Sequence, residues 1–189
     1  MTVVLDSRTE APISRLGAAD PESLPDDISK LVEAHGGDNW IRALSLNPDT
    51  ARRFVRYFEQ LFSATGSTLP LAERELIAVV VSTANGCGLC ALHHTHALGA
   101  ALDDHAKARR VATDLHFASL TSREQALADL ALKVTQNPRS VDHADFERLR
   151  REGLSEPAIL EAVETASWFN HTNRIFISTG VLPDDRYFA

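Results

Sequence analysis

An apolar segment between Pro70 and the pair Asn85-Gly86 restricts the possible folds more than any other part of the sequence. Its stretch LIAVVVSTA is apolar on nearly every side, which is typical of a helix that is buried all round. The β-branched run at 79–81 also fits a strand, and periodicity alone does not separate the two. We predict a helix over about 71–84, because the segment is about 15 residues long and no second strand-like run exists to pair with it.

Helix start and stop signals recur along the rest of the chain. Asn47 followed by Pro48 caps a predicted helix over about 49–63, and Thr121 with Glu124 forms a capping box. Further signals predict a short helix after Asp38 and helices over about 87–99, 103–115, 121–137, 142–152 and 155–179. The sequence therefore predicts an all-α fold in which a reversal at Asn85-Gly86 pairs two antiparallel helices.

The N-terminal segment differs from the rest. Residues 1–28 carry Pro12, Pro21 and Pro25 and show no sustained periodicity, so we predict an extended arm, followed by a single helical domain over 29–189.

Composition excludes several classes of protein. The chain has 189 residues, 44% of them hydrophobic, which suffices for one globular domain with a buried core. Its 19 Lys and Arg against 26 Asp and Glu give a net charge of −7, which disfavours nucleic acid and anionic membranes as partners. No apolar run approaches the roughly 20 residues of a spanning helix, and the N-terminus lacks the features of a signal peptide. We therefore expect a cytoplasmic protein.

The two cysteines, Cys87 and Cys90, lie at the predicted start of a helix. Residues three apart share a helix face, so the two sulfur atoms can meet. Free N–H groups and the positive end of the helix dipole stabilise a thiolate at this position and lower its pKa. His94 lies one turn beyond Cys90, where it is placed to accept the thiol proton or to stabilise the thiolate.

The predicted reversal also brings a carboxylate to the same place. Glu75 lies ten residues before Asn85 and His94 eight after Gly86, which corresponds to roughly 15 and 12 Å along the two helices. The two side chains are then nearly level. A carboxylate, an imidazole and two thiols in this order form a relay in which each group orients or activates the next.

Other interpretations of these residues stay open. The thiols could be inert and buried, or they could bind zinc together with His93, His94 or His96. Against zinc, all of these side chains share one short helix, which does not close a tetrahedral shell without distant ligands. Glu75 could be a surface charge paired with Arg74.

The spacing of Glu75, Cys87, Cys90 and His94 resembles the core motif of the alkylhydroperoxidase D-like, peroxidase-related branch of the carboxymuconolactone decarboxylase superfamily. The resemblance covers about residues 40–182 and implies a helical bundle that assembles into trimers or hexamers. It also implies thiol-dependent reduction of hydroperoxides in antioxidant defence.

The family's pattern assigns a role to each residue. It implies that Cys90 attacks the peroxide, that Cys87 resolves the resulting sulfenic acid as a disulfide, and that His94 and Glu75 pass protons. Leu89 departs from the pattern, because the best-studied branch carries histidine there and many relatives carry tyrosine. Leucine transfers no proton, so we expect slower peroxide reduction or a different substrate.

We expect a hydroperoxide substrate and an external dithiol or thiol as the reductant. No glycine-rich dinucleotide fingerprint follows a strand, so we expect no cofactor, and we assign no metal site. The alternatives are a non-enzymatic redox-sensing or zinc-binding module, and a carboxymuconolactone decarboxylase-like lyase. The lyase is disfavoured because members of that branch generally lack the cysteine pair.

Two further groups of side chains are interpreted as structural. An aromatic stripe in the helix at 49–63 is predicted to form core or a subunit interface rather than a substrate pocket: Phe54, Tyr57, Phe58 and Phe62. Polar residues in the last helix are predicted to satisfy buried backbone rather than line the site: Asn170, His171, Asn173 and Arg174.

Overall fold

The computed structural model describes residues 12–188, so residues 1–11 of the predicted arm and residue 189 lie outside the described part. Within it, the chain forms nine α-helices and four short 3-10 helices and no strand, which confirms the all-α prediction. The α-helices are α1 (Asp26–Ala34), α2 (Asn39–Leu44), α3 (Pro48–Leu61), α4 (Leu71–Asn85), α5 (Gly88–Leu102), α6 (His105–Thr113), α7 (Ser122–Gln136), α8 (His143–Arg151) and α9 (Glu156–Thr179). The 3-10 helices are η1 (Pro21–Ser23), η2 (Leu115–Phe117), η3 (Pro138–Ser140) and η4 (Asp185–Tyr187).

Helix α4 forms the centre of the molecule. Every residue from 74 to 82 is buried, as expected for a helix that is covered on all sides. The helix ends at Asn85, and Gly86 adopts a left-handed conformation with φ of 71°, which glycine reaches without steric cost. The chain then turns directly into α5. The predicted helix at 71–84 and the reversal after it are therefore confirmed.

Helix α5 extends past its predicted end at Gly99. It continues to Leu102, and Asp103 takes the left-handed position with φ of 52°. Gly99 does not end the helix but allows α6 to pack closely against α5, because a Cβ atom at this position would overlap the ring of His105 at the start of α6. The predicted boundary was wrong because a glycine inside a helix has the same sequence signature as one that ends it.

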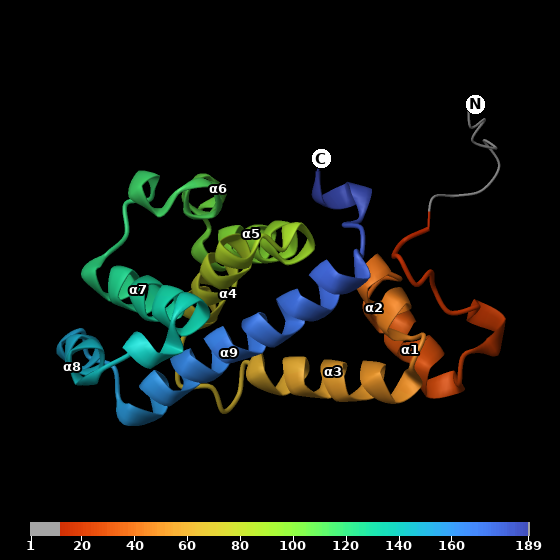
Figure 1. Cartoon of the computed structure of the whole chain (residues 1–189), viewed down its shortest axis with the longest axis horizontal. Coiled ribbons are helices and arrows are strands. Elements are labelled where there is room, and N and C mark those ends of the chain that lie inside the picture. The colour runs from red at the N-terminus through yellow and green to blue at the C-terminus, as the bar shows by residue number, and fades with distance from the viewer. Residues whose placement is uncertain (1–11, 189) are drawn as a thin grey trace.

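The long helix α9 runs diagonally through the molecule (Figure 1). It packs against α4 and α7, while α5 pairs with α4 and α6. Helix α3 lies along the other side of α9, and α1 and α2 stand at the N-terminal end of α3 (Figure 1). None of the described helices is long and apolar enough to cross a membrane.

The described part of the predicted arm is partly helical. It contains η1 and the start of α1, a helix that the sequence signals did not indicate. Residues before η1 attach to the C-terminal end of the chain: the Arg15 amide donates to the Thr179 carbonyl at 2.7 Å, and the Leu182 amide donates to the Ile13 carbonyl at 2.8 Å.

Candidate active site

The hairpin of α4 and α5 brings Glu75 and His94 into contact. The His94 Nδ1 atom lies 2.7 Å from the Glu75 Oε2 atom, and the two side chains are 15% and 6% exposed. Because a carboxylate only accepts hydrogen bonds, Nδ1 donates and Nε2 remains free to exchange a proton. Glu75 is therefore not a surface charge. Its neighbour Arg74 points elsewhere and donates to the Leu61 carbonyl at 2.6 Å.

The two thiols are buried at the N-terminus of α5. Cys87 is the N-cap residue and Cys90 lies in the first turn, and they are 2% and 5% exposed. Their sulfur atoms are 2.8 Å apart, which exceeds the roughly 2.05 Å of a disulfide bond, and both cysteines are free. The sulfurs share a hydrogen bond.

This shared hydrogen bond moves the two thiol pKa values in opposite directions. The pKa of Cys87 is lowered, first by the hydrogen bond with Cys90 and also by the charge of the His94 imidazolium. The pKa of Cys90 is raised, by the same hydrogen bond and by burial. Between the two thiols Cys87 donates to Cys90, and because the pKa of Cys87 is the lowered one, Cys90 becomes the donor once Cys87 has lost its proton.

Asn173 supports the thiol pair from α9. It is fully buried, its Oδ1 atom accepts from Asn85 at 3.0 Å, and its Nδ2 atom donates to the Ser82 hydroxyl at 3.1 Å. An amide nitrogen carries two N–H groups, so one remains for the sulfur atoms. The Asn173 amide accordingly lowers the pKa of both Cys87 and Cys90.

A cavity of about 450 Å³ opens beside the thiol pair. Glu75, Cys90 and His94 line it, whereas Cys87 does not. Leu89 also lines the cavity, at the position where the family pattern has a proton-transferring side chain. Six aromatic side chains from α2, α3 and α9 form a large part of the remaining wall: Trp40, Phe54, Phe58, Trp168, Phe169 and Phe176. A compound that enters the cavity therefore meets Cys90 and not Cys87.

The C-terminal η4 closes one side of this cavity. Tyr187 stacks on His93 with the ring centroids 3.8 Å apart, and Arg186 pairs with Asp38 at 2.5 Å. The Tyr187 hydroxyl also donates to Asp38 at 3.2 Å. Burial lowers the pKa of His93 to about 3, so its imidazole is neutral. Asp38 was predicted to cap α2, but it makes no capping hydrogen bond because its carboxylate binds Arg186 and Tyr187 instead.

Comparison with known proteins supports the family resemblance. The pattern of the carboxymuconolactone decarboxylase family matches residues 48–133. The crystal structure of the alkylhydroperoxidase AhpD core of an uncharacterized peroxidase-related protein from Ralstonia eutropha JMP134 superimposes with a TM-score of 0.89 at 31% identity, covering 95% of this chain and 96% of that one. The chain belongs to the alkylhydroperoxidase D-like branch of this superfamily.

Other solved structures share the fold of this AhpD-like protein. An uncharacterized peroxidase-related protein from Silicibacter sp. TM1040 is 28% identical with a TM-score of 0.86, covering 97% of each chain. A cysteine-to-alanine variant of the debrominase Bmp8, solved in complex with 2,3,4-tribromopyrrole, is 21% identical with a TM-score of 0.74, covering 97% of this chain and 96% of that one. No protein of curated function matches the chain.

The aromatic stripe of the AhpD-like protein only partly follows its prediction. Phe54 belongs to the buried core and Phe58 packs against it, as expected, but both also line the cavity. Phe62 packs against His94 at a centroid distance of 6.0 Å, and Tyr57 is 39% exposed. The period of three and four residues identifies the apolar face of a helix, but it does not show whether a cavity interrupts the packing.

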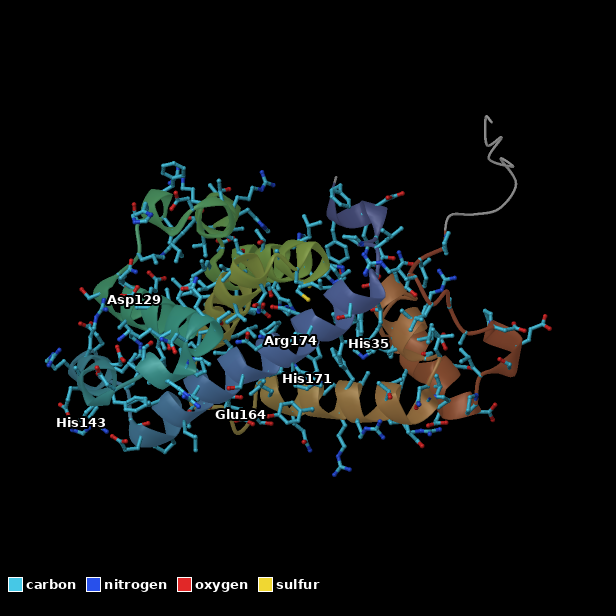
Figure 2. All side chains as sticks on the ribbon, viewed as in Figure 1. His35, Asp129, His143, Glu164, His171 and Arg174 are labelled. Carbon is cyan, nitrogen blue, oxygen red and sulfur yellow. The ribbon has the colours of Figure 1, made fainter. Side chains whose placement is uncertain are left out.

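Asn170, His171, Asn173 and Arg174 lie outside the cavity, which agrees with a structural interpretation, whereas Thr172 of the same helix lines it. His171 and Arg174 are exposed on α9, where Figure 2 labels both. Arg174 donates to the Asn170 side chain at 2.9 Å. Asn173 differs because its side-chain amide hydrogen-bonds to the thiol pair from outside the cavity.

Metal-ligand atoms come together at a different place from the thiols. Among residues 12–188, the cluster of potential ligands consists of Asp38, His93 and Asp184, whose ligand atoms lie within 4.8 Å of one another. Neither cysteine belongs to it, and Arg186 already neutralises Asp38. His96 is exposed on α5.

Proposed function

We propose that this AhpD-like protein reduces organic hydroperoxides with Cys90 and Cys87 and takes its electrons from an external dithiol. One observation carries the proposal: the cavity reaches Cys90 beside the Glu75–His94 pair, while Cys87 lies behind Cys90 with its sulfur 2.8 Å away. In this proposal Cys90 is the attacking thiol, Cys87 the resolving thiol and His94 the proton donor.

The first step breaks the O–O bond. The Cys90 sulfur attacks the terminal peroxide oxygen and passes its proton to the Cys87 thiolate across their hydrogen bond. The sulfur becomes a sulfenic acid, and the leaving alkoxide takes a proton from the His94 imidazolium to form an alcohol. Glu75 holds the imidazole ring in place through Nδ1.

The second step forms a disulfide and the third removes it. The Cys87 thiol attacks the Cys90 sulfenic acid, the S–O bond breaks, and the thiol proton leaves with the hydroxide as water. Neutral His94 is placed to carry that proton. An external dithiol then reduces the disulfide by exchange and becomes a disulfide itself. In total, hydroperoxide and dithiol become alcohol, water and an oxidised dithiol.

Peroxide turnover by cysteine variants tests this proposal. With dithiothreitol as reductant, we expect turnover in the wild-type protein and none in Cys90→Ser. In the absence of dithiothreitol, which would itself reduce a sulfenic acid, Cys87→Ser should consume one equivalent of peroxide and then hold a sulfenic acid, detected as a dimedone adduct at Cys90 by mass spectrometry.

The same variants separate the rival functions. A lyase acts on a carbon skeleton and needs no resolving thiol. Lyase activity that survives Cys87→Ser would therefore support that function and contradict our proposal. A redox sensor would form the disulfide once without sustained turnover. Stoichiometric zinc retained at neutral pH would support a metal-binding module.

A further inference from the structure

The cavity beside Cys90 is much larger than a peroxide group requires. A water molecule occupies about 30 Å³ in the liquid, so hydrogen peroxide would leave most of the roughly 450 Å³ unfilled. The volume falls within the range of sites for whole organic ligands, roughly 300–1,000 Å³. The space beside the thiol is therefore large enough for an organic group attached to the peroxide.

The lining divides this space into a polar and an aromatic part. Helices α4 and α5 supply Glu75, Cys90 and His94, whereas α2, α3 and α9 supply six aromatic rings. The C-terminal η4 adds Tyr187 and the Arg186 that pairs with Asp38. Phe54 is central to the aromatic part, with ring centroids 5.0 Å from Trp168, 5.5 Å from Phe176 and 5.7 Å from Trp40. Aromatic rings prefer tilted or edge-to-face neighbours at such distances, and the contacts between these rings are tilted or edge-on.

The charges on the cavity wall favour an uncharged ligand body. Arg186 is the guanidinium of the lining, and it is paired with Asp38 at 2.5 Å. His93 is neutral because burial lowers its pKa to about 3. A carboxylate on the substrate would therefore find its cationic partner already occupied, and burying it there would be costly.

We propose that the substrate is a neutral aryl hydroperoxide, whose ring lies among Trp40, Phe54 and Trp168 while its hydroperoxide group faces Cys90. This inference rests on the proposed function for the chemistry at Cys90 but not for the binding of the ring. The reaction at Cys90 and the binding of the aromatic ring can therefore be tested separately.

Two hydroperoxides that differ in one substituent test the preference. Cumene hydroperoxide and tert-butyl hydroperoxide are both tertiary, and a phenyl group in the first replaces a methyl group in the second. A hydrophobic pocket discriminates about tenfold or more for even a small difference in apolar size, so we expect kcat/KM at least about tenfold higher for cumene hydroperoxide. Hydrogen peroxide should be poorer than either.

Binding is measured without chemistry by using the corresponding alcohols. The chain has two tryptophans, Trp40 and Trp168, and both line the cavity, so their fluorescence reports its occupancy. We expect 2-phenyl-2-propanol to change the fluorescence saturably, with a dissociation constant at least about tenfold below that of tert-butanol. Trp40→Leu should reduce this preference severalfold, whereas Phe117→Leu, at a residue that is 64% exposed and outside the cavity, should leave it unchanged.

The outcomes separate the two proposals. Equal kcat/KM values for the two hydroperoxides together with equal affinity for the two alcohols would overturn the aryl preference and leave the peroxidase proposal intact. Preferential binding of the phenyl alcohol without turnover of either hydroperoxide would overturn the proposed function and retain the aromatic ligand.

Discussion

Replacing Glu75 by glutamine removes the charge of the relay while keeping its shape. Glutamine is nearly isosteric with glutamate, and its amide oxygen still accepts a hydrogen bond from His94 Nδ1. The variant loses the negative charge that neutralises the imidazolium, in a pair whose side chains are only 6% and 15% exposed. The positive charge of His94 that lowers the pKa of Cys87 is thereby weakened.

The size of the effect follows from the 2.7 Å hydrogen bond between Glu75 and His94. A hydrogen bond to a charged group contributes about 1.5–3 kcal/mol, and a neutral one about 0.5–1.5 kcal/mol. The substitution therefore removes about 1–2 kcal/mol from the stabilisation of the imidazolium. Because the proposed reaction starts from a protonated His94 beside the Cys87 thiolate, the same loss lowers the population of this reactive state, and kcat/KM should fall by about five- to thirtyfold, since each 1.4 kcal/mol is a factor of ten.

Two assays measure this prediction. Hydroperoxide turnover gives kcat/KM, and the rate of iodoacetamide alkylation as a function of pH gives the apparent pKa of the thiol pair, which should rise in Glu75→Gln. Glu73→Gln on the same helix is the matched control, because Glu73 is also largely buried and pairs with Arg123 at 2.6 Å. The control should lower the melting temperature and leave the alkylation profile in place. A Glu75→Gln protein with wild-type kcat/KM and a wild-type alkylation profile would refute a role for the carboxylate.

Two further predictions concern His93 and Asn173. The pKa of His93 is lowered to about 3 from an ordinary value near 6.5, so between these values the unfolded chain binds one more proton and stability falls as the pH is lowered. From pH 7 to pH 5, urea unfolding of the wild type should therefore lose about 2 kcal/mol more than that of His93→Gln, and equal losses would contradict the prediction. Asn173→Ala removes an amide that lowers both thiol pKa values, so its alkylation profile should shift to higher pH. Asn85→Ala, which leaves the Asn173 amide in place, should shift the profile less, and an unshifted profile in Asn173→Ala would remove Asn173 from the site.

The sequence predicted most helices because their signals are local. Caps such as Asn47 and the Thr121–Glu124 capping box appear in the structure as predicted. The contact of Glu75 with His94 was also predictable, because the hairpin is tight and the rise per residue of a helix fixes which side chains are level. Helix α1 was missed because Pro25 and the acidic residues after it resemble a linker, and burial of Ile28 against the core stabilises the helix instead.

The cavity wall could not be predicted in the same way. Trp40 lies in α2, and Tyr187 comes from the far end of the chain, so neither belongs to a local pattern. Their positions depend on long-range contacts such as the pair of Arg186 with Asp38. The sequence did contain one signal, the adjacent charged and aromatic residues Arg186 and Tyr187. It gives no indication that their partner is Asp38.

In the proposed reaction, the thiol pair separates the residue that carries the negative charge from the residue that attacks the peroxide. Cys87 lies behind the cavity, where the imidazolium of His94 and the Asn173 amide stabilise a thiolate, while Cys90 lines the cavity and keeps the higher pKa. Intrinsic nucleophilicity of a thiolate falls as its pKa falls, with a Brønsted coefficient of about 0.4–0.5. A thiolate formed at Cys90 in the course of attack is therefore more reactive than a permanently stabilised one. The 2.8 Å contact between the sulfur atoms would allow this in the proposed mechanism, because Cys87 would accept the proton at the moment that Cys90 bonds to the peroxide oxygen. The same contact leaves Cys87 protonated and adjacent to the sulfenic acid that it must attack next.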